Sequence, residues 1–116
     1  MARASWGSDH AGGCVQFGAD CHVRLGAELL AHTWDPVLIA VLRGGPRRRR
    51  DLMATIGGIS DKALHQSLNR LLKRGLVARV EEEEIRYELT ELGWSFADGP
   101  VRVLAYWAYD HASDLA

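Results

Sequence analysis

The polar side chains between residues 60 and 74 recur at helical spacing, opposite a row of leucines. The apolar row, Leu64, Leu68, Leu71 and Leu72, shares one face of a helix with 3.6 residues per turn. The opposite face carries Lys62, His65, Gln66, Asn69 and Arg70. In the major groove of DNA, arginine and lysine pair with guanine, whereas asparagine and glutamine pair with adenine. The pattern therefore predicts a helix that packs on one side and contacts base pairs on the other, with an ordinary solvated face as the alternative.

Two kinds of DNA contact are expected along this polar face. Base contacts cluster in the N-terminal half of such a helix, so we expect Lys62, His65 and Gln66 to contact base edges. Contacts that position the protein on the phosphates are expected from Ser60, Asn69, Arg70 and Arg74.

A run of four arginines at residues 47–50 precedes this helix. Residues 43–74 hold nine arginines or lysines against two aspartates, a net charge of +7, although the whole chain carries −1. Basic side chains that neutralise phosphates release counterions from DNA, so we expect at least two of Arg47, Arg48 and Arg50 to contact phosphate. Arg79 and Arg86 are further candidates for contact with the DNA backbone. A solvated face or a nonspecific basic patch is the alternative for the run.

Four consecutive glutamates at residues 81–84 separate two short apolar segments that are expected to pair as a hairpin. Phosphates would repel carboxylates at the tip of such a hairpin, so the general interpretation is a solvated turn held away from DNA. The alternative hypothesis is that the glutamates pair with the arginines when DNA is absent and thereby tune the affinity for DNA.

Start and stop signals divide the chain into helices. The expected helices cover residues 21–32, 36–43, 50–56 and 60–74. Asp20 is expected to cap the first helix, and Asp35 the second, with Pro36 in its first position. Ser60 is expected to cap the polar-faced helix, and Gly75 to end it in a left-handed conformation.

The remaining elements complete a winged helix-turn-helix. Short strands are expected at residues 76–80 and 85–89, followed by a helical region that Thr90 caps and Gly99-Pro100 interrupts. A short helix, a glycine turn, a helix with a polar face and a hairpin form this motif. The predicted fold class is therefore α+β, mostly helical, with a short hairpin as the wing. Residues 1–19 are expected to form a flexible N-terminal arm, and residues 20–116 the winged helix-turn-helix domain with terminal dimerisation helices.

Several short segments between residues 21 and 110 follow one another in a distinctive order and spacing. They are Cys21 followed thirteen residues later by Trp34, then Val37-Leu38-Ile39-Ala40-Val41-Leu42, Gly45-Pro46-Arg47-Arg48, Asp51-Leu52 and Gly58-Ile59-Ser60. They continue through Leu64, Leu68, Leu71, Gly75-Leu76-Val77-Ala78-Arg79 and Tyr87-Glu88-Leu89-Thr90-Glu91-Leu92-Gly93. Through these segments the chain resembles the HxlR family of MarR-like winged-helix regulators. The sequence departs from the family pattern at His22, where a proline is usual, at Arg49, where an aromatic residue is usual, and in a shorter, acidic wing.

The resemblance implies a homodimeric, sequence-specific transcriptional regulator held together by its N- and C-terminal helices. Its expected partners are double-stranded DNA, with a palindromic operator, and a second copy of the chain. Many members of the family sense electrophiles or oxidants through a cysteine at the position of Cys21, so a small electrophile or another effector is a further expected partner. An effector-controlled regulator with inert cysteines is the alternative.

The two cysteines offer a redox pair. Cys21 is expected at the start of a helix, which favours the thiolate, and Cys14 could resolve an oxidised Cys21. A buried, unreactive Cys21 in a dimer interface is the alternative. Cys14, Cys21, His10 and His22 include zinc-type ligands, but their spacing matches no standard site, so no metal and no cofactor are expected.

Five aromatic residues are expected at a ligand pocket or a dimer interface. They are Trp34, Trp94, Tyr106, Trp107 and Tyr109. Because aromatic side chains bury large areas, the core and the dimer interface are the favoured interpretation.

The sequence contains no phosphate-binding loop, nucleophile elbow or metal triad, so we do not expect an enzyme. The longest apolar run, residues 36–42, is too short to cross a bilayer. A cytoplasmic location is expected because no apolar leader is apparent. The alternative to a DNA-binding regulator is a winged-helix module that binds an acidic protein partner through its basic face.

Overall fold

A computed structural model describes residues 21–116, and the chain divides into two compact units, residues 1–31 and residues 32–116. The first unit contributes one described helix, α2 (His22–Glu28). Cys21 is its N-cap, and the Cys21 Sγ accepts a hydrogen bond from the Val23 backbone N–H at 3.4 Å. The predicted arm at residues 1–19 and the predicted cap Asp20 lie outside the described residues.

The helix α2 is shorter than the sequence predicted. We expected it to reach residue 32, but it ends at Glu28. From there the backbone N–H groups of Leu29, Leu30 and Ala31 each bond to the carbonyl three residues back. Such bonds tighten the chain into 3₁₀-type turns, which commonly end α-helices.

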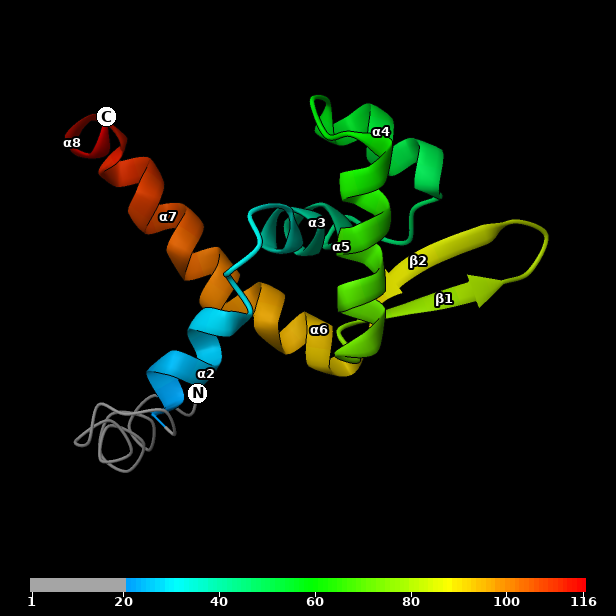
Figure 1. Ribbon diagram of the computed structural model, residues 1–116, viewed down its shortest axis with the longest axis horizontal. Helices are drawn as coiled ribbons and strands as arrows, with labels where there is room; N and C mark the ends of the chain where they lie inside the picture. Colours follow the sequence, from blue (N-terminus) through cyan, green and yellow to red (C-terminus); the bar gives the residue numbers. More distant parts are fainter. Residues whose placement is uncertain (1–20) are drawn as a thin grey trace. The chain divides into compact units, whose positions relative to one another are not determined.

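The second unit is a helical assembly with a projecting hairpin (Figure 1). Its elements are, in order, α3 (Trp34–Leu42), α4 (Arg49–Ile56), α5 (Asp61–Lys73), β1 (Val77–Glu81), β2 (Ile85–Leu89), α6 (Glu91–Phe96), the π-helical turn η3 (Ala97–Val101), α7 (Arg102–Asp110) and α8 (Ala112–Leu115). The helix α7 extends on the side of this unit opposite the hairpin. The α+β winged helix-turn-helix fold expected from the sequence is confirmed.

The core of this unit forms where α3 packs against α5 and η3. From α3, Leu38, Ile39 and Leu42 are buried, and they meet the leucine face of α5. That face contributes Leu64, Leu68 and Leu71, as its spacing predicted. Leu52, Ile59, Leu76, Val77, Leu89, Phe96 and Val101 complete the buried apolar set from the neighbouring elements.

The start of α3 differs from the sequence prediction. We expected Asp35 as the N-cap, but the helix begins at Trp34, and Thr33 is the cap residue. Asp35 lies in the first turn and is buried, where its carboxylate accepts hydrogen bonds from Ser67 and Arg70 of α5. A carboxylate cannot be buried without such donors. Pro36 still lies in the first turn, where a backbone N–H is not needed.

The helix-turn-helix is closed by a glycine turn. After α4, Gly57 and Gly58 adopt φ angles of 60° and 77°, a left-handed region that favours glycine. Ile59 then inserts into the core, being only 5% exposed. Ser60 caps α5 as predicted, since its Oγ accepts a hydrogen bond from the Ala63 N–H at 3.0 Å.

The wing begins at the left-handed cap of α5. Gly75 has a φ of 75°, as predicted, and the next N–H, that of Leu76, returns to the Leu71 carbonyl at 3.0 Å. The strands pair antiparallel with Val77 opposite Leu89. On the outer side of β2, Tyr87 exchanges two backbone hydrogen bonds with Arg47, at 2.8 and 3.0 Å. The wing is thereby tied to the segment that leads into α4.

The region after the wing is more continuous than expected. Thr90 caps α6 as predicted, its Oγ1 accepting from the Gly93 N–H at 3.0 Å. Gly99-Pro100 does not interrupt the helix, because η3 carries the chain through both residues into α7. The wider π-turn gives the Pro100 ring room that an α-helical turn lacks. Among the described residues, no helix is long and apolar enough to cross a membrane.

Candidate nucleic-acid interface

The helix α5 separates its polar and apolar residues as the sequence predicted. Lys62, His65, Gln66 and Asn69 are exposed, whereas the leucine face is buried. The Asn69 Nδ2 and His65 Nε2 lie 3.2 Å apart, within hydrogen-bond distance one turn along the helix. The exposed face therefore presents one cation and three groups that can donate or accept hydrogen bonds.

The sequence pattern predicted that Arg70 extends outward with the other polar side chains of α5, and this prediction is wrong. The Arg70 Nη2 and Nε donate to the two carboxylate oxygens of Asp35 at 2.9 and 3.0 Å. The same carboxylate accepts from the Ser67 hydroxyl at 2.6 Å. The bond to Asp35 raises the pKa of Arg70 above its ordinary value. Arg70 therefore anchors α5 to α3, and its guanidinium is already used inside the protein.

The side chains of the arginine run at residues 47–50 have different partners, on α5 and on the wing. Arg49, whose orientation the sequence left open, donates to the Asp61 carboxylate at 2.7 Å and to the Asp61 carbonyl oxygen at 3.1 Å. The hydrogen bond from Arg49 lowers the pKa of Asp61 below its ordinary value. Arg49 thus links the start of α4 to the start of α5.

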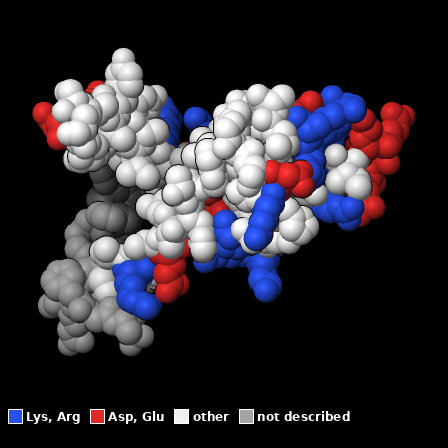
Figure 2. All heavy atoms as spheres, turned by 45° about the horizontal axis from the view of Figure 1, so that its top comes forward, with Lys and Arg blue, Asp and Glu red and all other residues white. Residues whose placement is uncertain are grey.

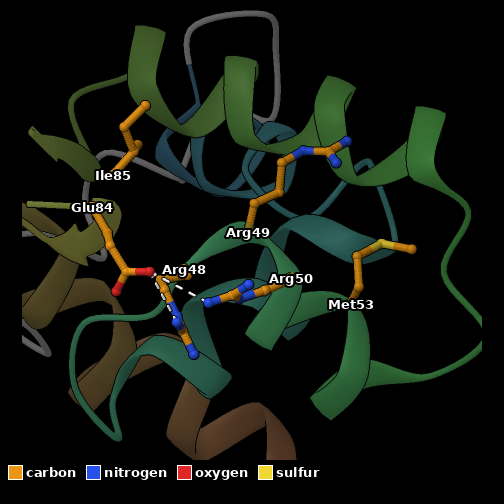
Figure 3. A pocket seen from close by; sticks show the side chains of 6 residues that line it. All are labelled: Arg48, Arg49, Arg50, Met53, Glu84 and Ile85. Carbon is orange, nitrogen blue, oxygen red and sulfur yellow. Dashed lines mark hydrogen bonds and ion pairs between the residues drawn. The ribbon is translucent and has the colours of Figure 1, made fainter.

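Arg48 and Arg50 lie toward the wing (Figure 3). The Arg48 Nη1 donates to Glu84 Oε1 at 3.0 Å, and the Arg50 Nη2 reaches the same oxygen at 3.4 Å. Asp51 accepts from the Arg48 Nε at 2.8 Å, so it fixes the Arg48 side chain. These hydrogen bonds from Arg48 lower the pKa values of Asp51 and Glu84. The arginines and Glu84 line a pocket of about 430 Å³.

The glutamate run does not behave as one unit. Glu84 contacts Arg86 at 3.5 Å in addition to the two arginines of the run, and Glu81 pairs with Arg79. Within residues 21–116, Glu82 and Glu83 make no ion pair. Figure 2 shows the basic side chains beside the acidic tip of the hairpin. Glu84, which sequence reasoning did not separate from its neighbours, is identified by its contacts with three arginines.

The remaining candidate residues lie elsewhere. Cys21 is buried, at 4% exposure, and Cys14 and His10 lie outside the described residues. No group of three metal-ligating residues occurs among residues 21–116. Of the aromatic residues, Trp34 is half-buried, and Trp94, Tyr106, Trp107 and Tyr109 are exposed. The helix α7 contains no buried residue.

A short helix, a glycine turn, a second helix with an exposed polar face and a wing define a winged helix-turn-helix protein. The model of the HxlR-like helix-turn-helix family matches residues 29–115, and the chain belongs to this family. It is a transcriptional regulator with a DNA-binding fold.

Named relatives agree with this classification. The HTH-type transcriptional regulator YtfH of Escherichia coli (strain K12) is 35% identical over 98 residues, 78% of this chain and 75% of the relative. The structure of the regulator YtfH from Salmonella typhimurium is 31% identical, with a TM-score of 0.72 over 86% of this chain and 92% of that one. The reduced form of the transcriptional regulator YodB from B. subtilis is 31% identical, with a TM-score of 0.66 over 76% and 90% of the two chains.

Proposed function

We propose that a homodimer of this chain binds a palindromic operator, with α5 of each subunit in the major groove. The observation that carries the proposal is the exposed polar face of α5, opposite buried leucines and held in place by Arg49 and Arg70. Two such helices related by a two-fold axis reach half-sites about one helical turn, roughly 34 Å, apart.

Within this complex, Lys62, His65 and Gln66 contact base edges. The DNA backbone is held by residues around the helix, namely Arg47, Arg48, Arg50, Ser60, Asn69, Arg74, Arg79 and Arg86. Arg70 leaves this set because Asp35 already holds its guanidinium. The Ser60 hydroxyl accepts the capping hydrogen bond, which leaves its proton available to a phosphate oxygen.

Dimerisation is assigned to α7. Val103, Tyr106 and Trp107, at spacings of three and four residues, share one side of this helix and are 64%, 60% and 50% exposed. A group of neighbouring exposed apolar side chains is typical of an interaction site. A second copy of the chain is the occupant that a two-fold operator requires.

A thiol switch at Cys21 is proposed as the regulatory input. The family relative YodB has been solved in a reduced and in a quinone-bound form, the latter 29% identical to this chain. Cys21 is buried, so we expect that a local rearrangement must expose its Sγ before a reagent reaches it. Diamide would take two electrons and two protons from the Cys21 and Cys14 thiols and leave a disulfide. Cys21→Ser should keep DNA binding and lose the response to diamide; an unchanged response in this variant would assign the switch to Cys14, the other cysteine of the sequence. Wild-type protein that binds DNA but does not respond to diamide would move the sensor to the exposed aromatic residues.

Fluorescence anisotropy tests the proposal on DNA from upstream of the protein's own gene and on random duplex, at two salt concentrations. We expect both to bind more weakly at the higher salt concentration, and the specific duplex to bind more tightly. Random-sequence selection then finds an operator that lies elsewhere in the genome. If no sequence is preferred after selection, the winged-helix module that binds an acidic protein is favoured instead.

As a regulator, the protein is proposed to act in the cytoplasm and without enzymatic activity.

A further inference from the structure

Three arginines from separate positions in the sequence converge on the carboxylate of Glu84. Arg48 precedes α4, Arg50 lies in its first turn, and Arg86 belongs to β2. Their guanidinium nitrogens lie 3.0, 3.4 and 3.5 Å from a Glu84 oxygen. Figure 3 shows Arg48 and Arg50 directed at Glu84, while Arg49 points away toward α5. The arrangement is an oxyanion site that an internal carboxylate occupies.

The arginine at the centre of this site is fixed before any ligand arrives. Asp51 accepts from the Arg48 Nε at 2.8 Å and from its Nη2 at 3.2 Å, a two-point hold on the guanidinium. The Arg48 Nη1 is the nitrogen that remains for Glu84. Guanidinium groups bind carboxylates and phosphates with the same donor geometry. A phosphodiester that entered the site would therefore take the place of the Glu84 carboxylate.

We propose that Arg48, Arg50 and Arg86 form a binding site for a DNA backbone phosphate, and that Glu84 occupies this site in the free protein. The inference deepens the proposed function, since it names how the acidic wing and the basic face act together. DNA binding requires the wing tip to release the arginines. Because every DNA sequence has the same backbone phosphates, the wing lowers the affinity for all DNA sequences alike. Discrimination between base sequences is left to the exposed face of α5.

The geometry singles out Glu84 among the four glutamates. Glu83 is its neighbour on the same exposed turn and makes no ion pair with any residue of the described range 21–116. Glu83→Gln and Glu84→Gln therefore remove the same charge from the same part of the wing, but only the second empties the site. Glu83→Gln is the matched control for a long-range charge effect.

The first test measures the affinity of the full-length variants for random duplex DNA by anisotropy at low and high salt. We expect Glu84→Gln to bind roughly two- to tenfold more tightly than wild type at low salt, the range of a few exposed ion pairs. Glu83→Gln should gain less than half of this factor, and both gains should shrink as salt screens the charges. In an Arg48→Gln background, the gain from Glu84→Gln should largely disappear. Equal gains for the two single variants would overturn the inference.

A second test does not depend on an operator. Dimethyl phosphate, a phosphodiester probe, and inorganic phosphate are each titrated while the arginine Nε–H resonances are followed by NMR. In Glu84→Gln, both probes should shift the Arg48 and Arg86 resonances at lower concentrations than in wild type. If the resonances do not move in Glu84→Gln, the proposed phosphate site is wrong, even if the protein binds DNA. If these resonances move but no duplex binds, the site stands and the proposed function fails.

Discussion

Asp35 of α3 and Arg70 of α5 form an ion pair of 2.9 Å in which the carboxylate is almost fully buried and the guanidinium is 28% exposed. The Ser67 hydroxyl completes the set of donors to the carboxylate. The helix α3 also packs against η3, which continues into α7, the helix of the proposed dimer interface. The ion pair therefore joins α5 to the helix α3 that supports the start of α7.

Removal of Arg70 should destabilise the protein. In Arg70→Ala the Asp35 carboxylate stays buried with only the Ser67 donor, so we expect the free energy of unfolding to fall by about 2–3 kcal/mol, less than for a fully buried pair. Urea denaturation checks this value, with Asn69→Ala, an exposed neighbour on α5, as the control. The salt dependence of DNA binding by the folded variant should equal that of wild type. A shallower salt dependence would assign Arg70 to a phosphate after all.

Gly93 should tolerate no side chain. A Cβ at this position would clash with the Leu76 carbonyl oxygen, because the two atoms would lie closer than real Cβ contacts do and the oxygen is a backbone atom that cannot rotate away. We expect Gly93→Ala to lower the melting temperature, with a loss of about 1–3 kcal/mol as in other overpacked sites. Gly99→Ala is the control, because a Cβ at residue 99 would meet no atom within 4 Å. Equal melting temperatures for the two variants would show that α6 is free to move away from Leu76.

The wing contact should weaken in acid. The hydrogen bond from Arg48 and the charges of Arg48, Arg50 and Arg86 place the pKa of Glu84 below its ordinary value of 4.5. A carboxylate whose pKa is lowered in the folded protein stabilises the fold at pH values above the ordinary pKa. This stabilisation is lost as the pH falls through the lowered pKa. The contact should therefore persist at neutral pH and be lost only as the pH falls through the lowered pKa of Glu84, which lies below 4.5.

Carboxyl-carbon NMR titration checks this behaviour directly. The Glu84 midpoint should lie below 4.5 in wild type and rise in Arg48→Gln, because the largest cause of the lowered pKa is then absent. A midpoint that is the same in both proteins would mean that Arg48 does not hold Glu84 in solution.

A charge on α7 should dissociate the proposed dimer without unfolding the subunit. Val103 is 64% exposed, so Val103→Glu removes little packing within the subunit but places a carboxylate in the proposed interface. We expect sedimentation velocity to show a dimer for wild type and a monomer for the variant, with unchanged far-UV circular dichroism. Thr55→Glu, at an exposed position of α4, is the control. A dimer that persists in Val103→Glu would place the interface elsewhere.

Local signals in the sequence predicted much of this fold because they act over a few residues. The Ser60 and Thr90 caps, the left-handed Gly75 and the leucine face of α5 are all as expected. Asp35 was misassigned as a cap because its partners lie more than 30 residues away on α5. A pattern read over a few residues predicts only local hydrogen bonds, such as a helix cap. It does not reveal a partner that is distant in the sequence.

The candidate site was predictable as a surface but not as a set of contacts. Periodicity identified the exposed side chains of α5, such as Gln66, because the opposite face is apolar. It could not separate Arg70 from them, since an arginine at the border of two faces can turn either way. The choice of Glu84 from four adjacent glutamates depends on how the wing meets α4 in three dimensions, and the pairing of Arg49 with Asp61 depends on how α4 meets α5.

Random-sequence selection with wild type and Gln66→Ala tests most directly whether the exposed face of α5 reads the DNA sequence. Gln66 is exposed in the N-terminal half of the helix, so its loss should change the preferred bases at a symmetric pair of operator positions, at about 1–3 kcal/mol for each contact. Arg47→Ala should instead weaken binding to all sequences alike. If Gln66→Ala selects the same operator as wild type with the same affinity, α5 does not read the sequence through this face.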